Sequence, residues 1–292
     1  GSRLPKGEFQ MKKVVFFIFS VIFLFLISET TTLASSTVDV DSSQVNNGIV
    51  RVKFNTGTTK KVKLLISKGE QRVQYNLSNS EAYIGFPLQL GDGTYTVGIY
   101  ENTTDSKYRA VHTKSFYVTI TDVKKVYLNS VQEISWRQDS QAVLLAGRLL
   151  QEATLKKQQS HKNTTVQLSE REKVNVLYNY VVNNISYDYN KIKTLNYNYL
   201  PNIDQTILDK SGICYDYSAL LGAMLRSQGI PTKMAKGYTT WTSVYHAWNE
   251  VYLASENRWV VVDATYDAYM KRNNQLYAFE KDTTVYQKVK EL

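Results

Sequence analysis

Hydrophobic and polar positions divide this chain of 292 residues into three regions with different patterns. Near the N-terminus lies a continuous apolar run, "VVFFIFSVIFLFLIS". From residue 37 to about 122, apolar and polar residues alternate in short runs between turn-rich pieces such as "NTGT" and "GDGT". After that, apolar residues recur first at the spacing of helices and later again in strand-like runs.

The alternating region, residues 36–122, has the pattern of an antiparallel β-sandwich. Alternation with a period of two places one face of a strand in a core and the other face in solvent. Six or seven such runs at intervals of about 10 residues are typical of an immunoglobulin-like sandwich. Examples are "GIVRVKF", "KKVKLLIS", "QRVQYNL", "TYTVGIY" and "KSFYVTI". The pattern leaves open the alternative of a strand-rich extension of one larger domain.

Beyond a linker at residues 123–138, we expect residues 139–292 to form an α+β domain. The segment 140–157 has helical spacing with leucines on one face, and a second helix follows at 169–185 with a serine as its cap. The segment 186–202 is aromatic and polar without a clear period, so we expect an ordered loop there. A third helix and a run of antiparallel strands then complete the α+β pattern.

The N-terminal region has the features of a secretion signal. We interpret residues 1–10 as an expression-vector remnant and residues 11–35 as a signal peptide, with two lysines, an apolar segment of about 15 residues and small residues at its end. Since a spanning helix needs roughly 20 apolar residues, we expect cleavage and no integral membrane span afterwards. An uncleaved anchor is the alternative. We therefore predict a secreted or cell-surface protein of bacterial type.

Composition and charge narrow the range of partners. Without residues 1–34 the chain keeps 31 basic and 24 acidic residues, a net charge of +7, which favours loose attraction to an anionic surface such as a cell wall. The lysines are scattered and no recognition motif is present, so we do not expect nucleic acid as a partner. A single cysteine excludes an internal disulfide. The sequence has no phosphate-binding loop or metal-ligand spacing, and we predict neither a metal nor another cofactor.

The only cysteine, Cys214, lies at the front of a predicted helix in "GICYDYSALLGAMLRSQGIP", residues 212–231. Gly229 and Pro231 end this helix, and apolar residues at a three–four spacing bury one side of it. In the first turn, free backbone N–H groups and the positive end of the helix dipole favour a thiolate. The same N–H groups can hold a developing oxyanion. From position alone, a buried inert cysteine is the simpler interpretation.

A hairpin downstream supplies partners for a reactive cysteine. The runs "YHAWNEVYL" and "RWVVVDATYD" have the pattern of strands joined by "ASEN". If Leu253 pairs with Arg258, His246 and Asp263 become diagonal neighbours on one face, roughly 5–8 Å apart at their Cβ atoms. Cys214, His246 and Asp263 are therefore candidates for a nucleophile, a base and an orienting acid. The structural alternatives are a satisfied core histidine at His246 and a turn-capping role for Asp263.

Together these segments resemble the transglutaminase-like superfamily over roughly residues 165–270. The segments that carry the likeness are "EKVNVLYNYVVNNISYDYN", "GICYDYSALLGAMLRSQGIPTKMAKGY", "HAWNEVYL" and "RWVVVDATYD". The resemblance implies a papain-related α+β core with the cysteine helix packed on an antiparallel sheet. It also implies that Cys214 is the nucleophile, His246 the base and Asp263 the orienting acid. One departure is Tyr266, which stands where many members have tryptophan.

The resemblance further implies acyl transfer on an amide bond through a thioester, with hydrolysis by a peptidase or amidase placed slightly ahead of protein cross-linking. The expected substrate is a protein or peptide of the cell surface or cell wall. Tyr187 is the candidate for a side-chain oxyanion donor, and Trp241, Tyr245 and Trp248 are candidates for lining the substrate cleft. An alternative of another class is a surface binding or scaffold protein that keeps the fold without turnover.

Overall fold

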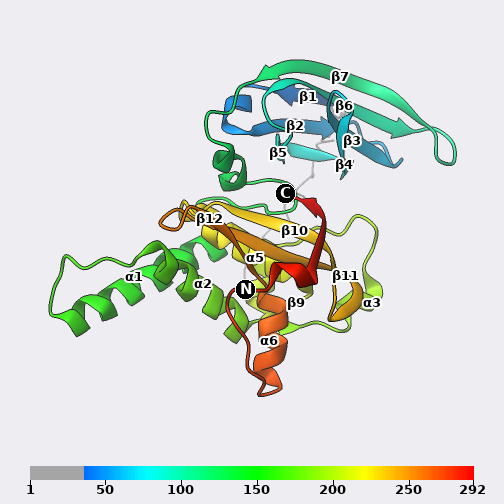
Figure 1. Cartoon of the computed structure of the whole chain (residues 1–292). Helices are drawn as coiled ribbons and strands as arrows, with labels where there is room; N and C mark the ends of the chain where they lie inside the picture. The colour runs from blue at the N-terminus through cyan, green and yellow to red at the C-terminus, as the bar shows by residue number, and fades with distance from the viewer. Residues whose placement is uncertain (1–35) are drawn as a thin grey trace, which may run out of the picture. The chain divides into compact units, whose positions relative to one another are not determined.

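The computed structural model describes residues 36–292, whose N-terminal part consists of antiparallel strands, as the alternating pattern predicts. A three-stranded sheet has the order β1-β2-β5, and a four-stranded sheet has the order β4-β3-β6-β7 (Figure 1). In β3 the period of two is clear, because Val62, Leu64 and Ile66 are buried while the residues between them are partly exposed. The strands are β1 (Thr37–Asp41), β2 (Ile49–Asn55), β3 (Val62–Lys68), β4 (Gln71–Leu77), β5 (Ser80–Pro87), β6 (Gly93–Asn102) and β7 (Tyr108–Val118).

The vector remnant and the signal peptide predicted for residues 1–35 lie outside the described residues. Among residues 36–292, no helix combines the length and the apolar character that a membrane crossing requires. In the same part of the chain, no group of histidine, cysteine and acidic side chains is arranged to hold a metal ion.

The C-terminal part combines helices with a four-stranded antiparallel sheet of order β12-β11-β10-β13, which gives the predicted α+β class. The strands of this sheet are β10 (Thr232–Thr239), β11 (Thr242–Leu253), β12 (Arg258–Val262) and β13 (Tyr286–Glu291). The helices are α1 (Gln141–His161), α2 (Glu170–Asn184), α3 (Lys191–Thr194), α4 (Ile203–Asp209), α5 (Cys214–Ser227) and α6 (Ala264–Arg272). Shorter elements are β8 (Ser186–Tyr187), β9 (Ser211–Gly212) and the 3-10 helices η1 (Val45–Asn47), η2 (Val123–Leu128) and η3 (Thr283–Val285).

Helix α5 is the centre of the C-terminal part. It packs on β10 and β11 and also contacts α1, α2, α4 and α6, so the cysteine helix lies on an antiparallel sheet as the resemblance implies. Leu220, Ala223 and Met224, which the spacing places on the buried side, are fully buried. Leu221 and Leu225 are equally buried. A helix that is apolar on several sides is enclosed by its neighbours, and such a helix gives a fixed support for its first residue.

The hairpin of β11 and β12 has the predicted register, with Leu253 opposite Arg258. The strand prediction is wrong for the end of "RWVVVDATYD", because β12 stops just before Asp263 and α6 follows. The reason is local: the Asp263 carboxylate accepts a hydrogen bond from the backbone N–H of Tyr266 (3.0 Å) and so caps the new helix. The apolar run "WVVV" before Asp263 does not indicate that the chain changes from strand to helix at this point.

The other helices follow the sequence with two differences. Helix α2 begins at a capping box, in which the Ser169 hydroxyl accepts from the N–H of Glu172 (3.3 Å) and the Glu172 carboxylate accepts from the N–H of Ser169 (2.6 Å). The segment 186–202 is mostly loop, as expected, but contains β8 and the single turn of α3. Helix α4 was not predicted, since its seven residues are too few to show a helical period.

Candidate active site

Cys214 is the first residue of α5 and the only cysteine of the chain. The residue before it, Ile213, has extended backbone and donates its N–H to the Asp216 carboxylate (2.9 Å). Because Asp216 supplies this cap, the Cys214 side chain is not needed to start the helix. Cys214 is 9% exposed, carries a free thiol and lines a cavity. The positive end of α5 at this position favours negative charge on the sulfur.

Asp216 fixes the chain where α5 begins. It is fully buried and accepts hydrogen bonds from Lys191 Nζ (3.1 Å), the Tyr199 hydroxyl and Ile213. Gly212 passes directly over it, since a Cβ at that position would lie 2.6 Å from the Asp216 Cβ. The glycine two residues before the cysteine is therefore required by the close approach of backbone and carboxylate.

His246 on β11 and Asp263 after β12 meet as the hairpin register predicts. His246 Nε2 lies 2.8 Å from Asp263 Oδ2, and the two residues are 5% and 0% exposed. Asp263 Oδ2 also accepts from the Tyr286 hydroxyl (3.0 Å), while Oδ1 caps α6 through Tyr266. The capping role and the histidine contact, which the sequence left as alternatives for Asp263, therefore exist together.

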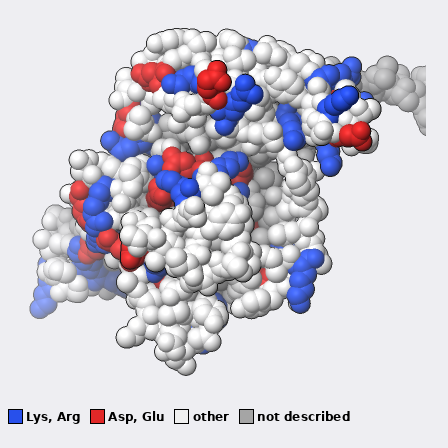
Figure 2. Space-filling model, turned by 45° about the vertical axis from the view of Figure 1, so that its right-hand side comes forward, with Lys and Arg blue, Asp and Glu red and all other residues white. Residues whose placement is uncertain are grey.

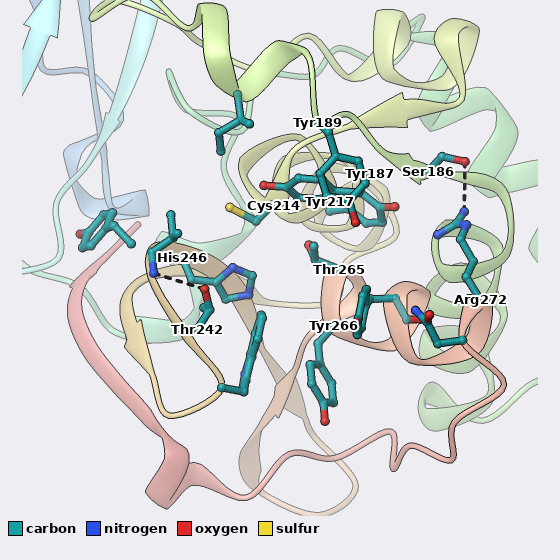
Figure 3. Close-up of a pocket in the computed structure, with 16 residues that line it drawn as sticks. Ser186, Tyr187, Tyr189, Cys214, Tyr217, Thr242, His246, Thr265, Tyr266 and Arg272 are labelled. Atoms are coloured by element: carbon teal, nitrogen blue, oxygen red, sulfur yellow. Dashed lines mark hydrogen bonds between the residues drawn. The ribbon is translucent and has the colours of Figure 1, made fainter.

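The surroundings of His246 keep its ring protonated. Burial by itself would lower the pKa of His246, but the charge and hydrogen bond of Asp263, together with the Cys214 thiol, raise the pKa to about 10. At neutral pH the ring is an imidazolium. Because Nε2 faces Asp263, Nδ1 is the nitrogen left for the thiol. Figure 3 shows the Cys214 sulfur and the His246 ring at the same end of the cavity.

Two tryptophans predicted to line the cleft contact the His246 ring from different directions. Trp241 is 39% exposed, lines the cavity and meets the ring edge-on, with centroids 4.7 Å apart. Trp248 is 1% exposed, lies nearly parallel to the imidazole at 6.2 Å and packs on Tyr286 at 5.0 Å. The predicted cleft role of Trp248 is therefore wrong, because its place along β11 buries it against β13 instead.

The cavity around Cys214 has a volume of about 710 Å³, which is in the range of small-molecule and peptide sites. Seven of its lining residues are tyrosine or tryptophan, among them Tyr245, which is 44% exposed as a cleft residue must be. Within the described residues, no aspartate or glutamate lines it, whereas Arg272 does. The wall is thus mainly aromatic, with positive charge from Arg272 and His246.

Tyr187, the predicted oxyanion candidate, lies on β8 opposite Gly212 and lines the same cavity as Cys214. Its ring packs on Tyr189 with centroids 4.9 Å apart (Figure 3). Burial, with a smaller contribution from the charge of Cys214, raises the pKa of Tyr187 to about 12. The hydroxyl therefore keeps its proton at physiological pH and is able to donate.

Sequence reasoning missed two residues of this site. Tyr286, which contacts Asp263, comes from the last strand, 23 residues further along the chain, and no local pattern marks it. Arg272 lies at the end of α6. Basic residues at positions 271 and 272 are an ordinary signal for the C-terminal end of a helix. The signal could not be used, because the preceding segment was predicted to be a strand.

Comparison with protein families matches residues 154–264 to the model described as the transglutaminase-like superfamily. Comparison with curated proteins gives no match.

Among solved structures, the chain is similar to a candidate cysteine protease of Cytophaga hutchinsonii, at 19% sequence identity and a TM-score of 0.31 over 70% of this chain and 72% of that one. It is similar to a protein named as a TGase at 18% identity and a TM-score of 0.32, over 64% of this chain and 49% of that one. It is also similar to red sea bream transglutaminase, at 13% sequence identity and a TM-score of 0.35 over 75% of this chain and 48% of that one. The chain thus spans about half the length of the latter two.

Proposed function

Residues 154–264 carry the core of the transglutaminase-like superfamily, and on this premise we propose that the chain is a cysteine enzyme that transfers the acyl group of an amide through a thioester on Cys214. The observation that carries the proposal is the meeting of three groups at one cavity. Cys214 begins α5, His246 faces it, and Asp263 holds His246 through a 2.8 Å contact. An inert core cysteine would need neither of the other two.

The proposed reaction uses each group in turn. His246 holds the proton of the Cys214 thiol on Nδ1, and the thiolate of this ion pair attacks the carbonyl carbon of the amide. The C–N bond breaks as His246 gives the proton to the leaving amine, which leaves a thioester on the sulfur and a neutral imidazole. Water, deprotonated by His246, then attacks the thioester, which releases a carboxylic acid and restores the thiolate and the imidazolium. Asp263 stabilises the imidazolium whenever it is present and fixes the ring orientation.

Stabilisation of the oxyanion is assigned to the start of α5 and to Tyr187. The first backbone N–H groups of a helix have no partners within the helix, so they are available to the negative oxygen. Tyr187 lines the same cavity, and its raised pKa of about 12 keeps the hydroxyl able to donate. Trp241 and Tyr245 supply apolar surface for the acyl donor.

Charge around the cavity supports hydrolysis over cross-linking. A lysine acceptor arrives as an ammonium ion, and the wall offers it the positive charge of Arg272 without any lining carboxylate among the described residues. A like charge close to the path of a cation disfavours its approach. Water meets no such barrier. We therefore place peptidase or amidase activity ahead of amine transfer.

The setting of the reaction is proposed from the sequence. The pattern of residues 11–35 favours export from a bacterial cell, and the net charge of +7 after residue 34 favours loose attraction to a cell wall. Figure 2 shows basic and acidic side chains interspersed on the visible face, without one continuous basic patch, which argues against nucleic acid as a partner. A cell-surface protein or cell-wall peptide is the substrate that fits these features.

We also infer that the N-terminal strands form an immunoglobulin-like sandwich. Sheets of three and four antiparallel strands are a common division in that class. Tyr95, near the start of β6, accepts from the N–H of Leu90 (2.8 Å) and donates to the carbonyl of Gly91 (2.8 Å). A tyrosine that bonds back to the backbone just upstream of its strand is the tyrosine corner of immunoglobulin-like domains.

The test is an assay with glutamine-containing and plain peptides, with and without a labelled primary amine. We expect new amino termini or ammonia, little incorporated amine, and no product from Cys214→Ala or His246→Ala. His246→Ala is the sharper control, because it keeps the thiol and removes only the base. Incorporation of the amine without hydrolysis would reverse the order of the two activities. Undiminished turnover by Cys214→Ala would remove the mechanism as a whole.

A further inference from the structure

Arg272, the last residue of α6, brings a positive charge to the cavity that holds Cys214. Its guanidinium donates to the backbone carbonyls of Ile185 (2.5 Å) and Ala268 (3.3 Å) and to the Ser186 hydroxyl (3.2 Å). Figure 3 shows Arg272 and Ser186 on the side of the cavity away from Cys214. All three acceptors are neutral, so they position the guanidinium without cancelling its charge.

No carboxylate within residues 36–292 forms an ion pair with Arg272. Arg171 and Arg258 differ from it, since both pair with Glu256 and Glu280. A guanidinium has five N–H donors, and the hydrogen bonds that Arg272 makes within the chain do not use all of them. Arg272 thus has both the charge and the donors to bind an anion.

The guanidinium is held in place from two sides. The Ile185 carbonyl that accepts a hydrogen bond from Arg272 also accepts one from the buried hydroxyl of Tyr217 (2.5 Å). Tyr217 belongs to α5. Arg272 is therefore tied both to its own helix through Ala268 and, through the Ile185 carbonyl, to the helix that carries the nucleophile. A donor that is fixed before binding loses little side-chain entropy when a ligand arrives.

The hydrogen bonds of Arg272 place its guanidinium beside β8. Ser186 and Tyr187 of this strand pair with Ser211 and Gly212, which lie shortly before Cys214 in the chain. A group bound at Arg272 therefore shares the cavity with an amide that reacts at Cys214.

We propose that the cavity selects acyl donors that carry a carboxylate near the reactive amide, and that Arg272 binds this carboxylate. The inference rests on the proposed acyl transfer at Cys214 and names the substrate class of that site. An arginine and a carboxylate form paired, charge-assisted hydrogen bonds, which a neutral amide of the same shape cannot replace. The carboxylate is either an acidic side chain or the free C-terminus of a short peptide.

The experiment measures kcat and KM for matched peptides that carry glutamate, glutamine, a free C-terminus or an amidated C-terminus at each of several positions near the reactive amide. The wild-type chain is compared with Arg272→Gln, Arg272→Lys and Lys271→Gln. Lys271 is the neighbouring residue on α6 and does not line the cavity, so Lys271→Gln removes the same charge without touching the site. Melting temperatures show that each variant is folded.

For Arg272→Gln we expect KM to rise about tenfold or more for the acidic peptides, with kcat and the neutral peptides nearly unchanged. Arg272→Lys should keep part of the preference for acidic over neutral peptides, and Lys271→Gln should keep all of this preference. Comparing glutamate with the free C-terminus identifies the source of the carboxylate. If KM rises equally for acidic and neutral peptides in Arg272→Gln, Arg272 only ties α6 to Ile185, and the proposal is wrong.

A second measurement separates this inference from the proposed reaction. Binding of the acidic and neutral peptides to Cys214→Ala is followed by calorimetry, with and without Arg272→Gln. Acid-selective binding that depends on Arg272 supports the subsite even if the wild-type chain turns over no amide. Equal binding of acidic and neutral peptides overturns the subsite while leaving the acyl transfer proposal to its own assay.

Discussion

Helices α5 and α6 each present one member of the proposed triad at their N-terminal end, but they do so in opposite ways. In α5, 12 of the 14 residues are buried, and the cap comes from Asp216, so the side chain of the first residue, Cys214, stays free. In α6, four of the nine residues are buried, and Asp263 is itself the cap. One oxygen of Asp263 starts the helix and the other holds His246.

This difference shows how a helix start can serve chemistry. A nucleophile must be free to react, so another residue has to satisfy the backbone in its place, and a tightly enclosed helix keeps it still. An orienting acid must only stay in one place, and the capping bond helps to fix it. The positive end of each helix favours the negative charge that its residue carries in the proposed reaction.

The largest expected effect separates the two duties of Asp263. Asp263→Asn keeps an oxygen that caps α6 but loses the charge that holds the imidazolium. We expect kcat/KM to fall on the order of 10³-fold or more, with far-UV circular dichroism unchanged. Asp263→Ala is the control, since it loses both duties and should also lower the melting temperature. A loss below about tenfold for Asp263→Asn would mean that the charge has no catalytic part.

The contact between Asp263 and His246 should also make stability depend on pH. The pKa of His246 is raised from 6.5 to about 10 in the folded chain, so the folded state binds its proton more tightly than the unfolded state. The resulting stabilisation is complete below about pH 6.5 and is lost as pH rises through 10. Urea unfolding between these values should show a steeper decline for the wild type than for His246→Gln. Parallel curves would contradict the raised pKa.

The support of α5 is tested at a glycine. A Cβ at Gly212 would lie 2.6 Å from the Asp216 Cβ, so Gly212→Ala must shift the cap and should cost about 2 kcal/mol of unfolding free energy. Gly147 in α1 has no atom within 4 Å of such a Cβ, and Gly147→Ala should instead stabilise by up to about 1 kcal/mol. Chemical denaturation measures both. If the two variants shift stability in the same direction, the close approach at Asp216 is not tight.

The smallest effect is expected at Tyr286, which donates to the same oxygen of Asp263 as His246 does. Tyr286→Phe removes one donor, so the carboxylate attracts the imidazolium more strongly and the pKa of His246 rises further. We expect the alkaline limb of the profile of kcat/KM against pH to move to higher pH. The free energy of unfolding should fall by about 1 kcal/mol. Tyr117→Phe, at an exposed position of β7, is the control. A downward shift of the limb would exclude this role.

Local patterns were enough to predict the parts of the site that lie close in sequence. Alternation along "YHAWNEVYL" and a four-residue loop determine which faces meet, so the contact of His246 and Asp263 follows from the pairing of Leu253 with Arg258. The cap signals and apolar spacing around Cys214 predict its helix in the same way. The seven-stranded pattern of the N-terminal part is equally local.

The rest of the site depends on tertiary packing that no spacing encodes. Tyr286 reaches Asp263 because β13 pairs with β10 across an irregular register. Arg272 enters the cavity only because α6 replaces a predicted strand. Trp248 is an aromatic residue of the kind that often lines a cleft, but Tyr286 packs on it and it is buried. Only the folded sheet creates this contact.

The central claim is that Cys214, His246 and Asp263 act as one unit, and labelling of the thiol tests it most directly. The chain has a single cysteine, so the rate at which a thiol-directed probe labels the protein at pH 6 reports on Cys214 alone. The account predicts that the folded wild type reacts faster than the same chain in denaturant, and that His246→Ala removes this advantage. A folded thiol that reacts no faster than the unfolded one, with or without His246, would contradict the account and favour a binding or scaffold protein without turnover.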